Sequence, residues 1–409
     1  MAERIAPVLG LEGVEVKAAV EQGGGWEIEV EVALPRRCTS CGGKVHGHGR
    51  LPRRRVSHLW IGVEAVHLNW LPKRGVCQQC GKTVATRPAG LERWQRQTPR
   101  AQQIALIALR RQSFRAVAQD LGASPASLRR LVDRTVPLED RSWWQIPGDL
   151  VLSVDEHSFR GTDLMITIAL RSPLKRLSTI LPDDRMASLT SWLKELPEEV
   201  RGRIRVVTTD LKESYRKVFA KHCPTAVVVP DPFHLVREMT RILDDVRRLE
   251  QAEIRRPIPR WPLVKGAEKL SLPQHGQLAA ICKDYPALAA LYALKEDFRT
   301  LLQEPDPAQA ARLLARWLLN ADSCDHVEGH MLANLIRKWR EGLLHHWHTA
   351  RRWTNGYIEG LHTKIKLLKR TSYGFTNRDR YRKKMLLAFL PASSGRSAGT
   401  TRPWPPSTP

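Results

Sequence analysis

The sequence lacks any apolar run that approaches the roughly 20 residues a membrane-spanning helix needs. Its first residues also lack the apolar stretch of a secretory signal peptide. These two absences argue against a membrane-embedded or exported protein. We therefore expect a cytoplasmic protein without a membrane partner.

Acidic residues are scarce relative to basic ones: 42 aspartates and glutamates stand against 66 lysines and arginines, which gives a net charge of +24. A chain this basic is expected to bind a polyanion, and nucleic acid is the commonest one, with a membrane surface as the alternative. Repeats of 20–50 residues and a heptad seam are absent, which argues against a solenoid and a coiled coil. The length of 409 residues allows two to four domains.

Cysteine is also uncommon, and four of the seven cysteines form two Cys-x-x-Cys pairs, each followed by glycine. Two such pairs supply four thiolates, the closed tetrahedral set of structural Zn²⁺. The alternatives are four ordinary cysteines or a redox pair, but no βαβ pattern supports a redox role. We expect a zinc-binding domain, and its ligands are Cys38, Cys41, Cys77 and Cys80.

The rest of this first region is predicted to be rich in strands. Residues 26–32 alternate apolar and polar side chains, and residues 59–68 have the pattern of a hairpin. A basic run, Arg53, Arg54 and Arg55, lies between the cysteine pairs and is a candidate for contacts with nucleic-acid phosphates. A charged loop exposed to water explains the same run equally well.

A helix-turn-helix pattern follows. Residues 113–121 have the pattern of a short helix, 122–124 form a turn, and Ser124 and Pro125 suit the start of a second helix. That helix is expected to turn its polar side chains, Ser127, Arg129 and Arg130, toward the major groove of DNA. Helical hairpins of this kind can also be simple packing units.

Three apolar segments, 151–156, 204–210 and 226–231, each run into a carboxylate and are predicted to be strands. The carboxyl ends of parallel strands line one crevice, where two aspartates can hold a pair of Mg²⁺ ions for phosphodiester chemistry. A single aspartate at a strand end is more often a turn or helix cap. Three in series within a basic chain favour a catalytic site. Strand alternation places Glu156 on the face opposite Asp155.

Four segments carry a family resemblance: SVDEHSFR at 153–160, TDLKESY at 209–215, PDPFHL at 230–235, and NGYIEGLHTKIKLLKR at 355–370, continued by TSYGF at 371–375. They resemble the bacterial insertion-sequence DDE transposases of the IS-L-three family. The resemblance covers residues 36–390. It implies that Asp155, Asp210 and Glu359 are catalytic carboxylates that bind Mg²⁺, or Mn²⁺, on an RNase H-like core.

The last of these segments is predicted to be a helix that Asn355 caps. Spacing of three and four residues puts Glu359 and His362 on one face with Lys366 and Arg370. The expected DNA contacts of this helix are Lys364, Lys366, Lys369 and Arg370. His362 stands where members of the family are expected to have an amide side chain.

Asp231 and His234 resemble an Asp-x-x-His signature of transposases with inserted helical domains. In that interpretation both residues face the crevice, and His234 donates a hydrogen bond to the scissile phosphate or helps to move a proton. The alternative is structural: Asp231 caps the following helix, which begins with Pro232, and His234 packs against it.

The predicted fold class is multidomain α/β, with an RNase H-like catalytic core that an all-helical insertion interrupts, preceded by a zinc-binding domain and a helix-turn-helix. The expected boundaries are 1–95 for the zinc-binding domain, 96–142 for the helix-turn-helix, 143–235 for the first part of the core, 236–346 for the insertion, 347–392 for the final helix of the core with Glu359, and 393–409 for a disordered tail.

The predicted function is DNA transposition at the bacterial nucleoid. A homodimer or higher multimer binds the terminal inverted repeats of its element, and water attacks the phosphodiester at the element's end. The freed 3′-hydroxyl then attacks double-stranded target DNA. One alternative is an RNase H-type endonuclease or resolvase without strand transfer. The other is a non-enzymatic zinc and helix-turn-helix regulator.

Overall fold

The computed structural model describes residues 13–61, 64–348 and 353–391. The chain has a mixed α/β architecture and forms two compact units, which are described separately. Unit 1 comprises residues 1–138 and 365–409, and unit 2 comprises residues 139–364. The tail expected to be disordered, 393–409, lies outside the described residues.

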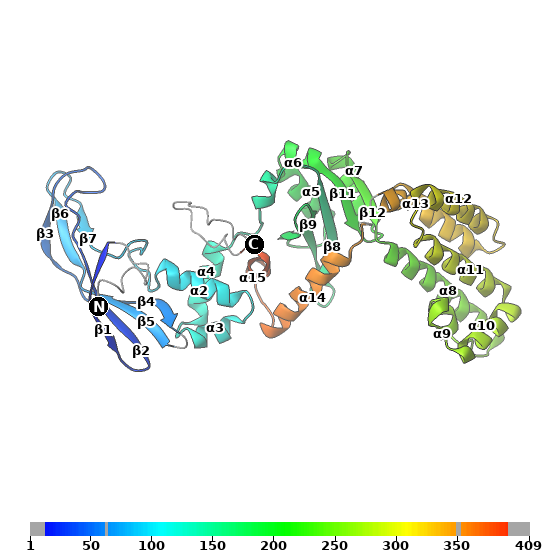
Figure 1. Cartoon of the computed structure of the whole chain (residues 1–409), viewed down its shortest axis with the longest axis horizontal. Coiled ribbons are helices and arrows are strands. Elements are labelled where there is room, and N and C mark those ends of the chain that lie inside the picture. Colours follow the sequence, from blue (N-terminus) through cyan, green and yellow to red (C-terminus); the bar gives the residue numbers. More distant parts are fainter. Residues whose placement is uncertain (1–12, 62–63, 349–352, 392–409) are drawn as a thin grey trace. The chain divides into compact units, whose positions relative to one another are not determined.

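Unit 1 begins with two small sheets (Figure 1). The larger has the order β1-β2-β5-β4 and consists of β1 (Val14–Glu21), β2 (Gly25–Val32), β5 (Glu64–Trp70) and β4 (Arg54–Ile61). The smaller consists of β3 (Val45–Arg50), β6 (Lys73–Cys77) and β7 (Thr83–Ala85). Both sequence predictions here are confirmed: β2 buries Ile28 and Val30, as its alternation requires, and β4 pairs with β5 in antiparallel register.

The helices of unit 1 are α2 (Pro99–Leu109), α3 (Phe114–Asp120), α4 (Pro125–Thr135) and α15 (Arg378–Phe389). The predicted helix-turn-helix is confirmed as α3 and α4. Ser124 caps α4 by accepting from the backbone N–H of Ser127, and Pro125 occupies the first turn. α15 was not predicted. It is joined to the preceding helices by Arg380, which pairs with Asp133, and by Lys384, whose ammonium group donates to the carbonyl of Leu109.

Unit 2 contains a five-stranded sheet with the order β10-β9-β8-β11-β12. Its strands are β8 (Leu150–Arg160), β9 (Asp163–Ser172), β10 (Arg176–Ile180), β11 (Ile204–Thr209) and β12 (Val227–Pro230). β8 pairs antiparallel with β9 and parallel with β11, so the sheet is mixed. The prediction that the first strand ends at its carboxylates is wrong. β8 continues to Arg160 because residues 155–160 form a hairpin with β9.

Four short helices accompany this sheet: η1 (Ser142–Gln145), α5 (Met186–Glu195), α6 (Glu198–Arg203) and α7 (Glu213–His222). One face of the sheet packs on these helices through a core that includes Leu152, Val154 and Phe219. Over the other face, Trp353 packs against Val151 and Val206. This second face therefore lies toward the segment that leads into α14 (Gly356–Thr371).

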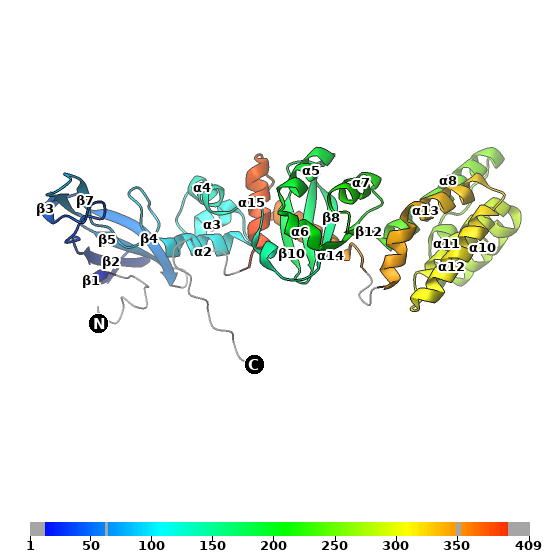
Figure 2. The same cartoon turned by 90° about the horizontal axis from the view of Figure 1, so that it is seen from above.

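A helical bundle is inserted between β12 and α14 (Figure 2). Its helices are α8 (Pro232–Ile254), α9 (Trp261–Val264), η2 (Ala267–Lys269), α10 (Leu272–Asp284), α11 (Pro286–Leu301), α12 (Pro307–Asp322) and α13 (Val327–His348). α13 returns to the sheet at Gly342, where a β-carbon would lie 2.1 Å from the carbonyl oxygen of Val228, so only glycine fits. Trp317 is buried in the bundle core, whereas Trp261 is 58% exposed.

The described residues include no helix with the length and hydropathy required to span a bilayer.

Candidate active site and metal centre

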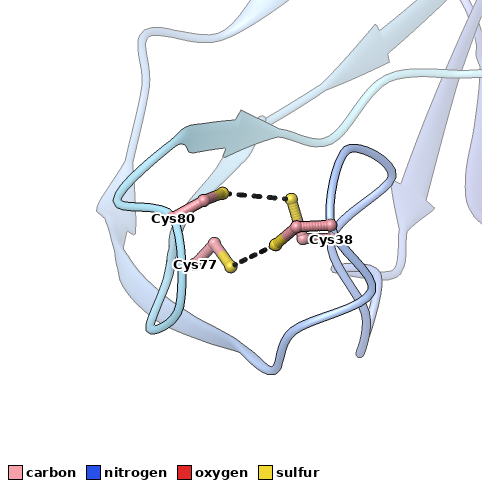
Figure 3. Close-up of side chains that lie close together, drawn as sticks. Cys38, Cys77 and Cys80 are labelled. Atoms are coloured by element: carbon pink, nitrogen blue, oxygen red, sulfur yellow. Dashed lines mark hydrogen bonds between the residues drawn. The ribbon is translucent and has the colours of Figure 1, made fainter.

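The four paired cysteines meet at one point in unit 1. Cys38 and Cys41 precede β3. Cys77 ends β6, and Cys80 lies in the turn that follows it, facing Cys38 (Figure 3). The Sγ atoms of Cys41 and Cys77 are 3.5 Å apart, and those of Cys38 and Cys80 are 3.8 Å apart. All four sulfurs lie within 4.8 Å of one another. Sulfurs bound tetrahedrally at about 2.3 Å from zinc would be about 3.8 Å apart, so this set fits the ion.

Backbone amides stabilise the thiolate forms of Cys38 and Cys77. The N–H of Ser40 lies 3.4 Å from the Cys38 sulfur, and this N–H together with that of Cys41 lowers the pKa of Cys38 to about 6. The N–H groups of Cys80 and Gln79 likewise lower the pKa of Cys77. Because zinc binds thiolates, these turns prepare the cysteines for the metal.

The basic run between the cysteine pairs is held by contacts within the chain. Arg53 pairs with Glu29, and Arg55 pairs with Glu27. Arg54 donates to two backbone carbonyls, those of residues 93 and 95. Arg54 therefore fixes a neighbouring segment, while Arg53 and Arg55 stay exposed at the surface.

The second helix of the helix-turn-helix is oriented as the sequence predicts. α4 buries Leu128 and Leu131 against its neighbours and leaves Arg129 and Arg130 exposed. Ser127 is half-buried, and its hydroxyl donates to the carbonyl of Ser124. The Ser127 side chain thus supports the first turn of the helix as well as lying on its polar face.

In unit 2, Asp155 lies on the sheet face that α14 covers. Asp155 pairs with Thr167 across β8 and β9, so both side chains point to the same face. The buried His362 of α14 bridges them: its Nδ1 is 3.2 Å from Asp155 Oδ2 and its Nε2 is 2.9 Å from Thr167 Oγ1. His157 Nδ1 lies 2.7 Å from the same hydroxyl.

Because a carboxylate only accepts hydrogen bonds, the Nδ1–H of His362 donates to Asp155. The Thr167 hydroxyl is shared by His157 Nδ1 and His362 Nε2, and it links the two rings. On α14, His362 turns inward and is buried, whereas Glu359, three residues before it, is exposed.

Asp210 directly follows β11 and is held by two groups. Asn355 Nδ2 donates to Asp210 Oδ1 at 3.0 Å, and His234 Nε2 lies 3.0 Å from Asp210 Oδ2. Burial raises the pKa of Asp210, but the hydrogen bonds from His234 and Asn355 outweigh it, and the pKa lies below its ordinary value. The Asn355 side chain, expected as a helix cap, is thus used at the site, and its Oδ1 accepts from Thr208.

Asp231 and His234 combine the two roles that the sequence left open. Asp231 Oδ1 accepts from the N–H of Phe233 and caps α8, while Oδ2 accepts from the N–H of Asn355 at 2.9 Å. The hydrogen bond to Asp210 raises the pKa of His234. Among the described residues, His234 Nδ1 is buried without a hydrogen-bond partner.

The exposed Glu359, in the first turn of α14, approaches this pair. Ligand atoms of Asp231, His234 and Glu359 lie within 4.8 Å of one another. His362, which holds Asp155, lies three residues further along the same helix. Asp155 and Asp210 each follow one of the paired residues Val154 and Thr209 on the neighbouring strands β8 and β11. Carboxylate oxygens suit Mg²⁺ or Mn²⁺.

Glu156 lies on the opposite face, as strand alternation predicts. Its carboxylate accepts from Tyr215 Oη at 2.5 Å and pairs with Lys212 at the start of α7. Burial and the neighbouring Glu156 raise the pKa of Tyr215, so its hydroxyl remains a donor. Glu156 thus belongs to the core between the sheet and α7.

The basic residues expected to contact DNA from α14 are mostly at the surface. Lys364, Lys366 and Arg370 are exposed, and Lys369 is half-buried. Sequence reasoning missed Thr167 and the positioning roles of His362 and Asn355. Strand alternation predicts that Asp155 and His157 lie on the same face of β8. It does not predict that β9 pairs with β8, and this pairing brings Thr167 next to them.

Comparison with known proteins places these observations in a family. Residues 152–385, more than half of the chain, match the model DDE_Tnp_ISL3, described as a transposase. The transposase of insertion sequence IS1001 from Bordetella parapertussis is 25% identical over 367 residues, which cover 86% of this chain and 88% of that protein. The transposase of IS1557 from Mycobacterium tuberculosis is 26% identical over 391 residues, covering 84% and 83%.

Among solved structures, the Drosophila P element transposase strand transfer complex matches 75% of this chain and 95% of that one. The sequence identity is 13% and the TM-score is 0.44, which is too low to establish a shared fold.

Proposed function

The chain belongs to the ISL3 family of DDE transposases, and on this premise we propose that it cuts the ends of an insertion sequence and joins them to target DNA. The catalytic centre is formed by Asp155, Asp210 and Glu359. The observation that carries this assignment is the set of dedicated partners, His362, Asn355 and His234, that hold the two aspartates in place.

The core of unit 2 is RNase H-like in this proposal. The order β10-β9-β8-β11-β12, with three antiparallel strands followed by two parallel ones, supports it. Residues 143–235 and the part of 347–392 that belongs to unit 2, 347–364, make up the core, and the bundle 236–346 is the insertion. Residues 1–95 form the zinc-binding domain and 96–142 the helix-turn-helix.

The carboxylates and their partners perform distinct tasks. Asp155, Asp210 and Glu359 would provide the oxygen ligands for Mg²⁺ or Mn²⁺. When bound, the ion would stabilise the negative charge that develops at the phosphate and would lower the pKa of water. His362 holds Oδ2 of Asp155, and Asn355 and His234 hold the two oxygens of Asp210, so the orientation of both carboxylates is fixed.

The reaction proceeds in two in-line displacements. In the first, a water oxygen attacks the phosphorus at the element's end, the P–O3′ bond breaks, and the 3′-oxygen leaves with a proton. In the second, that 3′-hydroxyl attacks a target phosphodiester and displaces its 3′-oxygen. His234 lies beside Asp210 and donates a hydrogen bond to the phosphate oxygens as negative charge develops.

DNA recognition belongs to unit 1. Zn²⁺ on the four cysteines fixes the small sheet, and α4 lies in the major groove of the terminal inverted repeat. Residues of α4, α14 and the run 53–55 contact DNA in this proposal, and the active species is a homodimer or higher multimer. The net charge of +24 supports binding to a polyanion.

A strand-transfer assay tests the function. Purified protein is incubated with Mg²⁺, a labelled duplex that carries the element's end, and a supercoiled target plasmid. We expect labelled plasmid to form. Cleavage without joining would instead indicate an endonuclease or resolvase, and binding without cleavage would indicate a regulator.

A further inference from the structure

We propose that the segment 92–97, called the strap, forms a DNA-binding groove together with α4, and that the exposed ring of Trp94 contacts the duplex. The inference rests on the proposed function, because it concerns how unit 1 recognises the element's ends. It adds a DNA contact outside the helix-turn-helix and outside the basic run 53–55.

Hydrogen bonds hold the strap in a defined conformation. The guanidinium of Arg54 donates to the carbonyls of residues 93 and 95, the latter at 2.9 Å. The N–H of Ser57 donates to the carbonyl of residue 96 at 3.0 Å, and the N–H of Thr98 donates back to Ser57 at 2.9 Å. The strap is therefore attached to β4 along most of its length, although it belongs to neither a helix nor a strand.

Trp94 extends from this ordered segment into water. Its side chain is 80% exposed, and the guanidinium of Arg93 lies 4.9 Å from the ring centre. Tryptophan is enriched at interfaces, so an exposed indole on a fixed backbone that lines a cationic cavity favours a surface that a partner covers. The cation beside the ring indicates an anionic partner.

The strap and α4 line the same cavity, which has a volume of about 1050 Å³. The residues that they contribute include Arg93, Trp94, Arg96, Ser127, Arg130 and Arg134. Glu92 is the acidic residue among those that line the cavity. The groove is therefore strongly cationic, and it is lined by residues of the helix expected to read base edges.

One face of α4 lines the groove. Ser127, Arg130 and Arg134 follow one another at helical spacing and all line it, whereas Arg129 does not. A duplex that lies along this face meets the strap next to the helix. Trp94 then contacts the sugar-phosphate edge or minor groove that flanks the major groove occupied by α4. An aromatic or apolar side chain in that position packs on deoxyribose or inserts at a base step.

An apolar contact and an ionic contact differ in their salt dependence. Loss of Arg96 removes a phosphate contact and should reduce the slope of log Kd against log salt by about one. Loss of Trp94 removes packing and no counterion release, so affinity should fall while the slope stays the same.

The experiment uses the full-length protein and a duplex that the wild type selects from a random pool. Fluorescence anisotropy measures Kd at several salt concentrations for the wild type, Trp94→Ala, Trp94→Phe and Arg96→Ala. Trp261→Ala is the matched control, because Trp261 is 58% exposed and has Arg260 5.2 Å from its ring centre, but lies in unit 2. Zinc content and melting temperature verify that each variant folds.

We expect Trp94→Ala to weaken binding about tenfold or more with an unchanged salt slope, because it removes the packing of an aromatic ring on the duplex. Trp94→Phe should retain most of the affinity, and Trp261→Ala should bind like the wild type. Wild-type affinity and an unaltered hydroxyl-radical footprint in a folded Trp94→Ala protein would overturn this inference but not the proposed function. A wild-type protein that selects no duplex would overturn the proposed recognition function as well.

Discussion

His362 and Asp155 are joined by a hydrogen bond of 3.2 Å between Nδ1 and Oδ2, although they come from α14 and β8, more than 200 residues apart in the sequence. Thr167 and His157 extend this contact into the core. The arrangement resembles the outer partners of metal-binding side chains, which fix the orientation of a ligand. His362 is in this account a positioning residue for Asp155.

Replacement of His362 should therefore weaken metal use more than DNA binding. We expect His362→Phe to raise the Mn²⁺ concentration for half-maximal cleavage, and to weaken Mn²⁺ binding measured by titration calorimetry, by roughly 10–100-fold. His362→Gln retains a donor and should recover part of the effect. Leu367→Ala, an exposed change on the same helix, is the control. An unchanged Mn²⁺ requirement in His362→Phe would rule out the positioning role.

Replacement of Asp231 and replacement of His234 should have different effects, because Asp231 caps α8 and His234 contacts Asp210. Asp231→Ala is expected to lower the free energy of unfolding by about 1 kcal/mol or more, since it removes the cap and leaves the N–H of Asn355 unpaired. His234→Ala should slow single-turnover cleavage by roughly 10²-fold with little change in melting temperature. Equal loss of stability in both variants would assign His234 to packing.

The cysteine cluster predicts one zinc ion per chain. Native mass spectrometry should detect this ion in the wild type and not in Cys38→Ser or Cys77→Ser, which each remove one of four thiolates. Cys324→Ser is the matched control, because Cys324 lies far along the chain in unit 2. Loss of zinc from Cys324→Ser, or retention of zinc by both Cys38→Ser and Cys77→Ser, would contradict the assignment.

Lys384 predicts a pH dependence of stability. Burial lowers the pKa of this lysine from 10.5 to about 8, so the folded chain binds fewer protons than the unfolded chain between these values. Stability should accordingly rise with pH in this window, by at most about 1.4 kcal/mol per pH unit from this group. From pH 8 to 10, the melting temperature of the wild type should rise relative to that of Lys384→Met. A constant difference across that range would show that Lys384 does not titrate there.

Local signals in the sequence were sufficient for the parts of the fold that depend on near neighbours. The cap and proline at residues 124 and 125, the glycines after the cysteine pairs, and the alternation of β2 each act within a few residues. They predicted the corresponding elements correctly. The face on which Glu156 lies also followed from alternation alone.

The parts that failed depend on distant partners. β8 continues past Asp155 because β9 pairs with it, and no local pattern reveals that pairing. α15 was missed because five of its twelve residues are basic, and its burial of Lys384 depends on the carbonyl of Leu109. Helical spacing placed His362 on one face with Glu359. Its hydrogen-bond partners, Asp155 and Thr167, come from distant strands, so spacing could not predict them.

The most direct test compares two adjacent carboxylates on opposite faces of β8. Single-turnover cleavage of an end-containing duplex with Mg²⁺ is measured for Asp155→Asn and for Glu156→Gln, whose amide oxygen can still accept from Tyr215. The account predicts that Asp155→Asn abolishes cleavage while the duplex stays bound, and that Glu156→Gln cleaves at close to the wild-type rate. Wild-type cleavage by Asp155→Asn would contradict the proposed catalytic centre.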